Sequence, residues 1–193
     1  MKFLFKRTLL IIFSFIPLFS VPVYSSDINE IIDNFTDNPG MRWQFYTDQV
    51  MGGVSTGKAG IKLDSEGPYL RLEGSVSTAN NGGFIQVRTY VSDGPKSAKG
   101  ILLKVRGNGE RYYMHINTSE TISLPQQYRF YYQANFPAYK EWNEVRLPFS
   151  SAFKRSKPQM REKIHGDNIR TIGLLAYGKD HNALLEIKYL SFY

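Results

Sequence analysis

Apolar side chains recur at every second position in several short runs of this sequence. In residues 84–91, Ile85 and Val87 fall on one face of an extended chain, and Gln86 and Arg88 fall on the other. The same alternation recurs at residues 101–106, 111–117, 128–136, 145–147, 172–177 and 184–189. Gly, Pro, Asn and Asp separate the runs, and no long stretch places apolar residues at helical spacing. The pattern therefore predicts an all-β chain of about ten short strands.

Strands with one apolar face each need a second layer to cover that face. Tyr and Phe supply nearly all of an aromatic share of 15%, which favours strands. One flat sheet cannot bury so much apolar surface, so we expect two sheets packed face to face. The turn Gly107-Asn108-Gly109 suits positive φ angles and predicts a hairpin that joins the strands at 101–106 and 111–117.

Residues 1–25 have the pattern of a secretory signal peptide. Lys2, Lys6 and Arg7 precede an apolar stretch at 9–19, and Val23 and Ser25 occupy the positions that a signal peptidase reads. A retained anchor is the alternative, but the apolar stretch is shorter than the about 20 residues of a membrane helix. We expect residues 26–193 to form one mature domain, secreted or periplasmic, with no integral membrane segment.

Charge and cysteine content limit the partners that can be expected. Removing the three leader cations from a net charge of +7 leaves +4, which is mild and gives no reason to expect a nucleic-acid partner. Basic residues gather at Lys154, Arg155, Lys157, Arg161 and Lys163, either as a solvated loop or as a patch for an anionic partner. The sequence has no cysteine, so disulfides, lipoprotein modification and thiol chemistry are excluded.

Motifs that resemble catalytic sites are incomplete. Residues 53–57, Gly-Val-Ser-Thr-Gly, match the nucleophile elbow of hydrolases, which needs a strand, a sharp turn and then a helix. The following residues continue as a strand, and nothing pairs Ser55 with a histidine. No two of His115, His165 and His181 have the spacing of zinc ligands. We therefore predict no catalytic residue, no metal and no cofactor, and a protein that is not an enzyme.

Several short motifs follow one another along the mature chain. They are Trp43, Asp48 and Val50–Ser55; Asn81–Phe84 with Arg88; Gly100-Ile101 and Val105–Gly109 with Tyr112; Trp142, Val145, Leu147–Phe149 and Phe153; and Ile172–Leu174. In this order they resemble the complex I intermediate-associated protein 30 family. The resemblance implies an all-β, galactose-binding-domain-like jelly-roll sandwich of two antiparallel sheets. It also implies a protein-binding, assembly or chaperone-like factor without established catalytic residues.

The secretory leader sets this chain apart from the founding members, which assist assembly of complex I in mitochondria. Complex I is therefore in doubt as the partner, and two binding roles stay open. Family resemblance favours a protein client in the cell envelope, and the leader favours a carbohydrate-binding module. The sequence indicates neither the ligand nor the oligomeric state.

Candidate binding residues lie on the polar faces of the predicted strands and in two glycine motifs. If the strands share one sheet, the surface comprises Arg88, Lys104, Arg106, Arg111, Tyr113, His115, Arg129, Tyr131 and Gln133. Aromatic rings beside guanidinium groups suit sugars, carboxylates or peptide segments, whereas an ordinary solvated sheet face is the alternative. Asp48, Ser55 and Asn81 join the candidates because paired glycines beside them let backbone or ligand approach closely, although tight turns would explain the same pattern.

Overall fold

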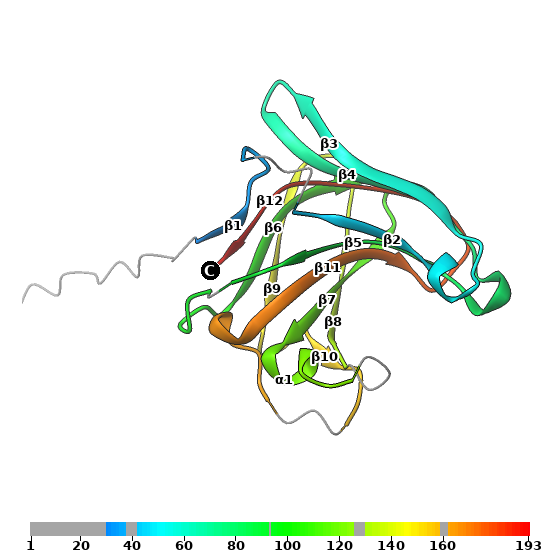
Figure 1. Cartoon of the computed structure of the whole chain (residues 1–193). Coiled ribbons are helices and arrows are strands. Elements are labelled where there is room, and N and C mark those ends of the chain that lie inside the picture. The colour runs from blue at the N-terminus through cyan, green and yellow to red at the C-terminus, as the bar shows by residue number, and fades with distance from the viewer. Residues whose placement is uncertain (1–29, 38–41, 93, 126–129, 159–161) are drawn as a thin grey trace, which may run out of the picture.

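The structure is a computed structural model that describes residues 30–37, 42–92, 94–125, 130–158 and 162–193 (Figure 1). The predicted leader at 1–25 and two of the basic candidates, Arg129 and Arg161, lie outside these ranges. Within the described ranges, no helix is long and apolar enough to cross a membrane.

The described strands form two antiparallel sheets. The first sheet has the order β3 (Thr56–Asp64), β4 (Gly67–Val76), β12 (His181–Phe192), β6 (Gly100–Gly107) and β9 (Asn143–Pro148), and β1 (Ile31–Asp33) also pairs with β12. The second has the order β10 (Lys154–Arg155), β8 (Tyr132–Pro137), β7 (Arg111–Thr118), β11 (Ile169–Tyr177), β5 (Phe84–Tyr90) and β2 (Gln44–Thr47). Helical structure in the described residues consists of α1 (Ser119–Ile122) and three short turns, η2 (Asp48–Met51), η3 (Ala79–Asn81) and η5 (Gly166–Asn168). The predicted two-sheet jelly-roll sandwich is confirmed.

The core lies between the two sheets, which face each other in Figure 1. Ile85 and Val87 of β5 are buried in it, as their alternation predicts. Met114 and Ile116 of β7 are also fully buried in this core, as is Leu72 of β4 in the other sheet. The alternation of apolar residues along these two strands therefore predicts correctly which side chains point to the core.

The predicted hairpin between β6 and β7 is wrong. β6 pairs with β12 and β9, whereas β7 pairs with β11 and β8, so the turn at 107–109 carries the chain from one sheet to the other. Gly109 does have a positive φ of 89°, but its N–H donates to Ala138, and the N–H of Gly107 donates to Tyr139. The same turn residues suit a hairpin and a connection between two sheets. Here the connection forms because β6 pairs with β12 and β7 pairs with β11.

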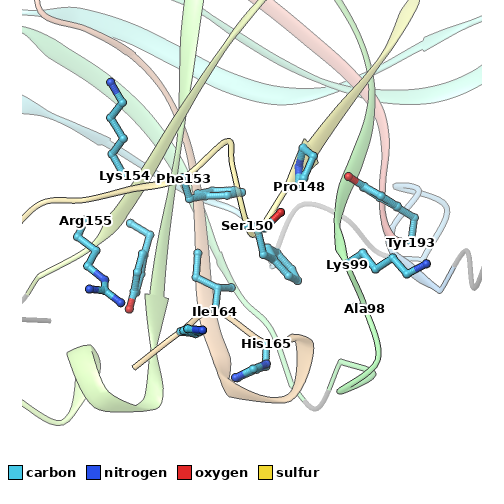
Figure 2. A pocket seen from close by; sticks show the side chains of 13 residues that line it. Ala98, Lys99, Pro148, Ser150, Phe153, Lys154, Arg155, Ile164, His165 and Tyr193 are labelled. Carbon is cyan, nitrogen blue, oxygen red and sulfur yellow. The ribbon is translucent and has the colours of Figure 1, made fainter. Parts of the chain in front are cut away.

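The sandwich is open along the side where β9 and β10 end the two sheets. Each is the last strand of its sheet, and the two do not pair with each other. A pocket of about 970 Å³ opens beside them, between Pro148 on one side and Lys154 and Arg155 on the other (Figure 2).

Candidate ligand-binding face

The two glycine motifs converge on one buried carboxylate, that of Asp48. Asp48 begins η2, and its carboxylate accepts the N–H of Ser55 at 2.9 Å and the Ser55 hydroxyl at 2.5 Å. It also accepts the N–H of Gly83 at 2.5 Å and that of Phe84 at 3.2 Å. Asp48 and Ser55 are both fully buried. Their polar groups thus join the loop before β3 to the loop before β5.

The same carboxylate explains why glycines stand beside it. A Cβ added to Gly53 or to Gly82 would approach the Asp48 carboxylate to less than 3.0 Å. Burial acts to raise the pKa of Asp48, but the hydrogen bonds from Ser55, Gly83 and Phe84 prevail and hold that pKa below its ordinary value. Asn81, in contrast, is exposed with φ at 58° and lies beside this cluster.

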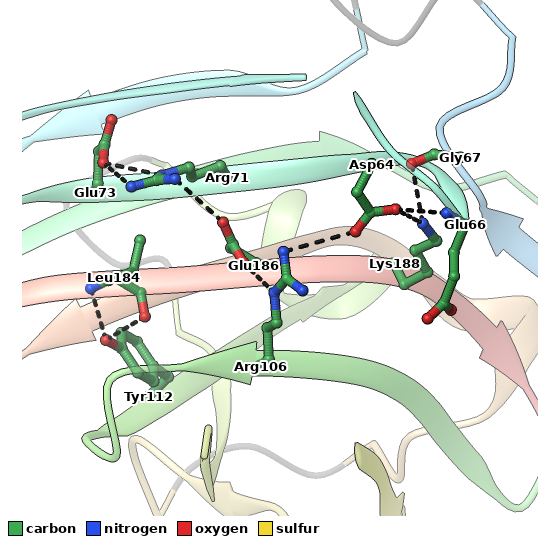
Figure 3. A network of polar contacts seen from close by, with 10 residues as sticks. All are labelled: Asp64, Glu66, Gly67, Arg71, Glu73, Arg106, Tyr112, Leu184, Glu186 and Lys188. Carbon is green, nitrogen blue, oxygen red and sulfur yellow. Dashed lines mark hydrogen bonds and ion pairs between the residues drawn. The ribbon is translucent and has the colours of Figure 1, made fainter. Parts of the chain in front are cut away.

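Arg106 lies in the first sheet, so the predicted surface does not form as one face. The outward side chains of that sheet pair with each other (Figure 3). Glu186 contacts Arg106 and lies 3.4 Å from Arg71, and Asp64 lies 2.8 Å from Lys188. Lys104, on the same strand as Arg106, pairs with Glu66 at 3.0 Å. The charged side chains of this outer face are therefore paired with each other and are not available to a ligand.

Trp142 belongs to the same outer face and packs against these cations. The Arg106 guanidinium lies 4.3 Å from the centroid of the Trp142 ring, and Tyr69 meets that ring edge-on at 5.8 Å. The ring face is thus occupied by a cation of the protein itself.

The second sheet gathers most of the predicted surface on its outer face. Strand register places Gln133, His115, Gly173, Arg88 and Gln44 in one row across β8, β7, β11, β5 and β2. The next row contains Asn135, Tyr113, Leu175, Gln86 and Tyr46. Five strands at a spacing of about 4.8 Å make this face roughly 19 Å wide. We call it the aromatic face and define it by Tyr46, Gln86, Arg88, Tyr113, His115, Tyr131, Gln133, Asn135 and Tyr177.

Ring contacts run along the aromatic face. His115 and Tyr131 stack with centroids 4.0 Å apart and planes inclined by 21°, and Nε2 of His115 lies 2.8 Å from Oε1 of Gln133. Tyr113 meets Tyr177 edge-on at 5.7 Å. These contacts hold the rings in fixed orientations, as a platform for a flat apolar ligand surface requires.

Two outward positions at the centre of the aromatic face are covered by their neighbours. Leu175 and Gln86 point outward by register, yet both are buried, whereas Tyr177 at the end of β11 is 42% exposed. Gly173 leaves the space that the Gln86 amide fills, because a Cβ there would lie within 3.0 Å of Nε2. Among the described residues, that Nε2 has no acceptor.

Two aromatic residues of this face were missed by sequence reasoning. Tyr46 lies on β2, whose four residues are too few for a clear alternation, and its ring is 5.6 Å from the Arg88 guanidinium. Tyr177 ends a run that is apolar at both alternating sets of positions, so no polar residues marked the outward side of this strand. Tyr177 is four residues after Gly173, so the two lie on the same side of the strand, and this spacing could have placed Tyr177 on the outer face.

A polar pocket of about 600 Å³ lies at the Tyr113 end of the aromatic face. Its lining residues are Gly109, Glu110, Arg111, Tyr113, Tyr177, Gly178 and Lys179. Lys179 pairs with Glu110 at 2.6 Å and lowers the pKa of that carboxyl. The pocket therefore extends the aromatic face beyond the pair formed by Tyr113 and Tyr177.

Among the described residues, no three His, Asp or Glu side chains are grouped so that they could hold a metal ion.

His115 is an uncharged member of the aromatic face at neutral pH. Burial lowers its pKa to about 4, the hydrogen bond with Gln133 opposes this shift, and the positive charge of Arg88 adds to it. The neutral imidazole offers one donor and one acceptor nitrogen.

Stability is expected to fall as the pH drops from about 6.5 to about 4, and His115→Gln should reduce that fall. The unfolded chain binds a proton on this imidazole near pH 6.5 but the folded chain only near pH 4, so acid favours unfolding by roughly 1–3 kcal/mol. Urea midpoints at pH 7.5 and 4.5 measure the loss in both proteins. His165 and His181 remain in both, so equal losses would contradict this role of His115.

The two facing antiparallel sheets define a class, the β-sandwich domains of the jelly-roll type. The sequence profile of the complex I intermediate-associated protein 30 (CIA30) family matches residues 34–187. The chain therefore belongs to the CIA30 family, as the order of its motifs predicts. Among curated protein sequences, none matches this chain.

Solved structures with this fold include carbohydrate-binding modules. A family 11 module from Clostridium thermocellum, in complex with a β-1,3-1,4-mixed-linked tetrasaccharide, is similar with a TM-score of 0.68 and 16% identity over 85% of this chain and 94% of the other. The family 11 module of the cellulosomal cellulase Lic26A-Cel5E of Clostridium thermocellum has a TM-score of 0.63 and 16% identity, over 84% and 93%. A family 30 carbohydrate-binding module has a TM-score of 0.51 and 9% identity, over 72% and 91%.

Proposed function

We propose that this protein is a secreted or periplasmic, non-catalytic module that binds a polysaccharide chain across the aromatic face. The observation that carries the proposal is the row of oriented rings beside uncharged hydrogen-bonding groups on one sheet. Sugar rings present C–H surfaces that pack on aromatic side chains, and their hydroxyls pair with amide, imidazole and guanidinium groups. Tyr131, His115 and Gln133 offer both kinds of contact side by side, His115 on β7 and the other two on or directly before the neighbouring strand β8.

Ion pairing distinguishes the aromatic face from the opposite sheet. The outward positions of β2, β5, β7, β8 and β11 contain no Asp or Glu, and Arg88 contacts the Tyr46 ring and the Gln86 amide. The opposite sheet differs, because Arg71, Lys104, Arg106 and Lys188 already have carboxylate partners and Trp142 is covered by Arg106. A ligand would have to break those ion pairs in order to bind there.

The test is native affinity electrophoresis of the chain from residue 26 through gels that contain one soluble polysaccharide each. The tetrasaccharide bound to the family 11 module makes β-1,3-1,4-glucan the first ligand to test, followed by xylan, β-1,4-mannan and galactan. We expect at least one polysaccharide to retard the protein relative to a non-binding standard. Unchanged mobility in every gel would contradict the proposal.

Family membership favours a second candidate, the binding of a protein client. The loop within the first family motif carries three exposed apolar side chains, Val50, Met51 and Val54, at 72%, 69% and 47% exposure. Exposed apolar residues grouped on a loop suit a protein contact better than a sugar contact. A pull-down from envelope extract that is lost in a Val50→Ser/Met51→Ser variant, with no polysaccharide bound, would favour this candidate instead.

A further inference from the structure

The pocket between β9 and β10 has an apolar floor and a basic rim (Figure 2). Tyr132 and Ile164 are buried at its base. Phe149 and Phe153 pack against the core with ring centroids 6.1 Å apart, and both line the pocket. The volume of about 970 Å³ is at the upper end of the range for sites that hold one drug-sized molecule. An apolar group can therefore be buried here without displacing core side chains.

The charged side chains that line this pocket all have one sign, although Glu120 and Glu162 lie near Tyr132. Four cationic side chains line it, namely Lys99, Lys154, Arg155 and Lys163, and no Asp or Glu is among the lining residues. Lys154 and Arg155 lie on one side of the rings, and Lys99 lies on the other beside Tyr193 (Figure 2). Lys99, Lys154 and Lys163 are exposed, so their flexible side chains can reach an acid group at the mouth. A field of one sign over an apolar floor attracts an amphiphile of opposite charge.

We infer that this pocket binds a soluble amphiphile with one acyl chain and one carboxylate. The acyl chain would lie on Tyr132, Phe149, Phe153 and Ile164, and the carboxylate would pair with the lysines of the rim. This assignment gives a function to three of the basic residues of segment 154–163, which the aromatic face does not use.

The pocket between β9 and β10 shares no lining residue with the aromatic face, although Lys154 at its rim lies opposite Gln133 of that face. Its one residue on β8 is Tyr132, which points to the core side, whereas Gln133 points to the aromatic face. Residues 98–99 and 148–150 approach it from the first sheet, which contributes nothing to the aromatic face. Failure of one proposal therefore leaves the other standing.

The test is isothermal titration calorimetry of the chain from residue 26 with dodecanoate, below the concentration at which it forms micelles. Dodecyltrimethylammonium has the same chain and the opposite charge. We expect saturable binding of dodecanoate at one site, at least about tenfold tighter than binding of the ammonium compound. Equal affinity for both, or no saturable binding of dodecanoate, would overturn the assignment.

Charge-reversal variants place the binding in this pocket. Lys99→Glu/Lys163→Glu is expected to weaken dodecanoate binding about tenfold or more, because the rim then repels the carboxylate. Lys62→Glu/Lys140→Glu changes the net charge by the same amount at two exposed sites outside the pocket and should leave the affinity within about twofold. Equal weakening by the two pairs would assign the effect to net charge and overturn the site.

Discussion

Gly82→Ala is expected to lower the free energy of unfolding by about 3 kcal/mol. A Cβ at this position would lie within 3.0 Å of the Asp48 carboxylate and at 3.0 Å from the Cα of Gly53, both inside the packed loop. The carboxylate must move, which weakens its hydrogen bonds with the N–H groups of Gly83 and Ser55. Each buried donor left without an acceptor costs about 1–3 kcal/mol. Urea denaturation at pH 7.5, with the slope m checked for constancy, measures the loss.

Gly60→Ala is the matched control for this substitution. Gly60 lies in β3, and a Cβ there would meet nothing within 4 Å, so the free energy of unfolding should change by no more than about 0.5 kcal/mol. The comparison also separates two interpretations of the glycine motifs. If Asp48 and Ser55 served a ligand rather than the fold, Gly82→Ala would abolish binding while leaving stability at the level of the Gly60→Ala protein.

Sequence reasoning located the inward-facing residues but not the partners of each strand. Alternation is a local property, so Ile85, Val87, Met114 and Ile116 could be assigned to the core from their spacing alone. Strand pairing is not local: β11 lies between β5 and β7, and it follows β7 by more than 50 residues. The hairpin prediction failed at Gly107 for this reason, because a turn fixes the local backbone and not the sheet that each strand joins.

The same limit explains which residues of the candidate site were found. Arg88, Tyr113, His115, Tyr131 and Gln133 were placed together correctly, because their strands share the second sheet. Arg106 has the same outward parity but lies in the other sheet, where Glu186 pairs with it. Its separation from the others could be predicted only with the strand order.

The glycine motifs illustrate a different limit. Paired glycines signal that something approaches the backbone closely, and the sequence cannot say whether it is a ligand or a side chain. Here it is the carboxylate of Asp48, at Gly53 from within its own loop and at Gly82 from another loop.

Tyr113→Ala and Tyr131→Ala are each expected to weaken polysaccharide binding at least about tenfold, and the double variant should lose measurable binding. A truncated ring removes both the stacking surface and the apolar area that a sugar ring would bury, and about 1.4 kcal/mol corresponds to tenfold in affinity. Tyr131 also supports the His115 ring at 4.0 Å, so its loss disturbs a second contact. Both side chains lie on the outer face of the sheet, half-buried, so we expect the fold to persist.

Two further variants show whether a loss of binding belongs to the aromatic face. Tyr139→Ala removes a tyrosine that is 58% exposed and lies outside that face, in the segment between β8 and β9. Trp142→Ala removes the large ring of the opposite sheet, which Arg106 covers. Circular dichroism and urea midpoints of all variants give the check on folding.

The decisive measurement is calorimetric titration of the wild-type chain and these variants with the polysaccharide that retards the protein most. We predict that Tyr113→Ala and Tyr131→Ala lose affinity about tenfold or more, while Tyr139→Ala and Trp142→Ala bind as the wild type does. Wild-type affinity in the Tyr113→Ala/Tyr131→Ala protein, or a loss confined to Trp142→Ala, would contradict the proposal that the second sheet holds the ligand.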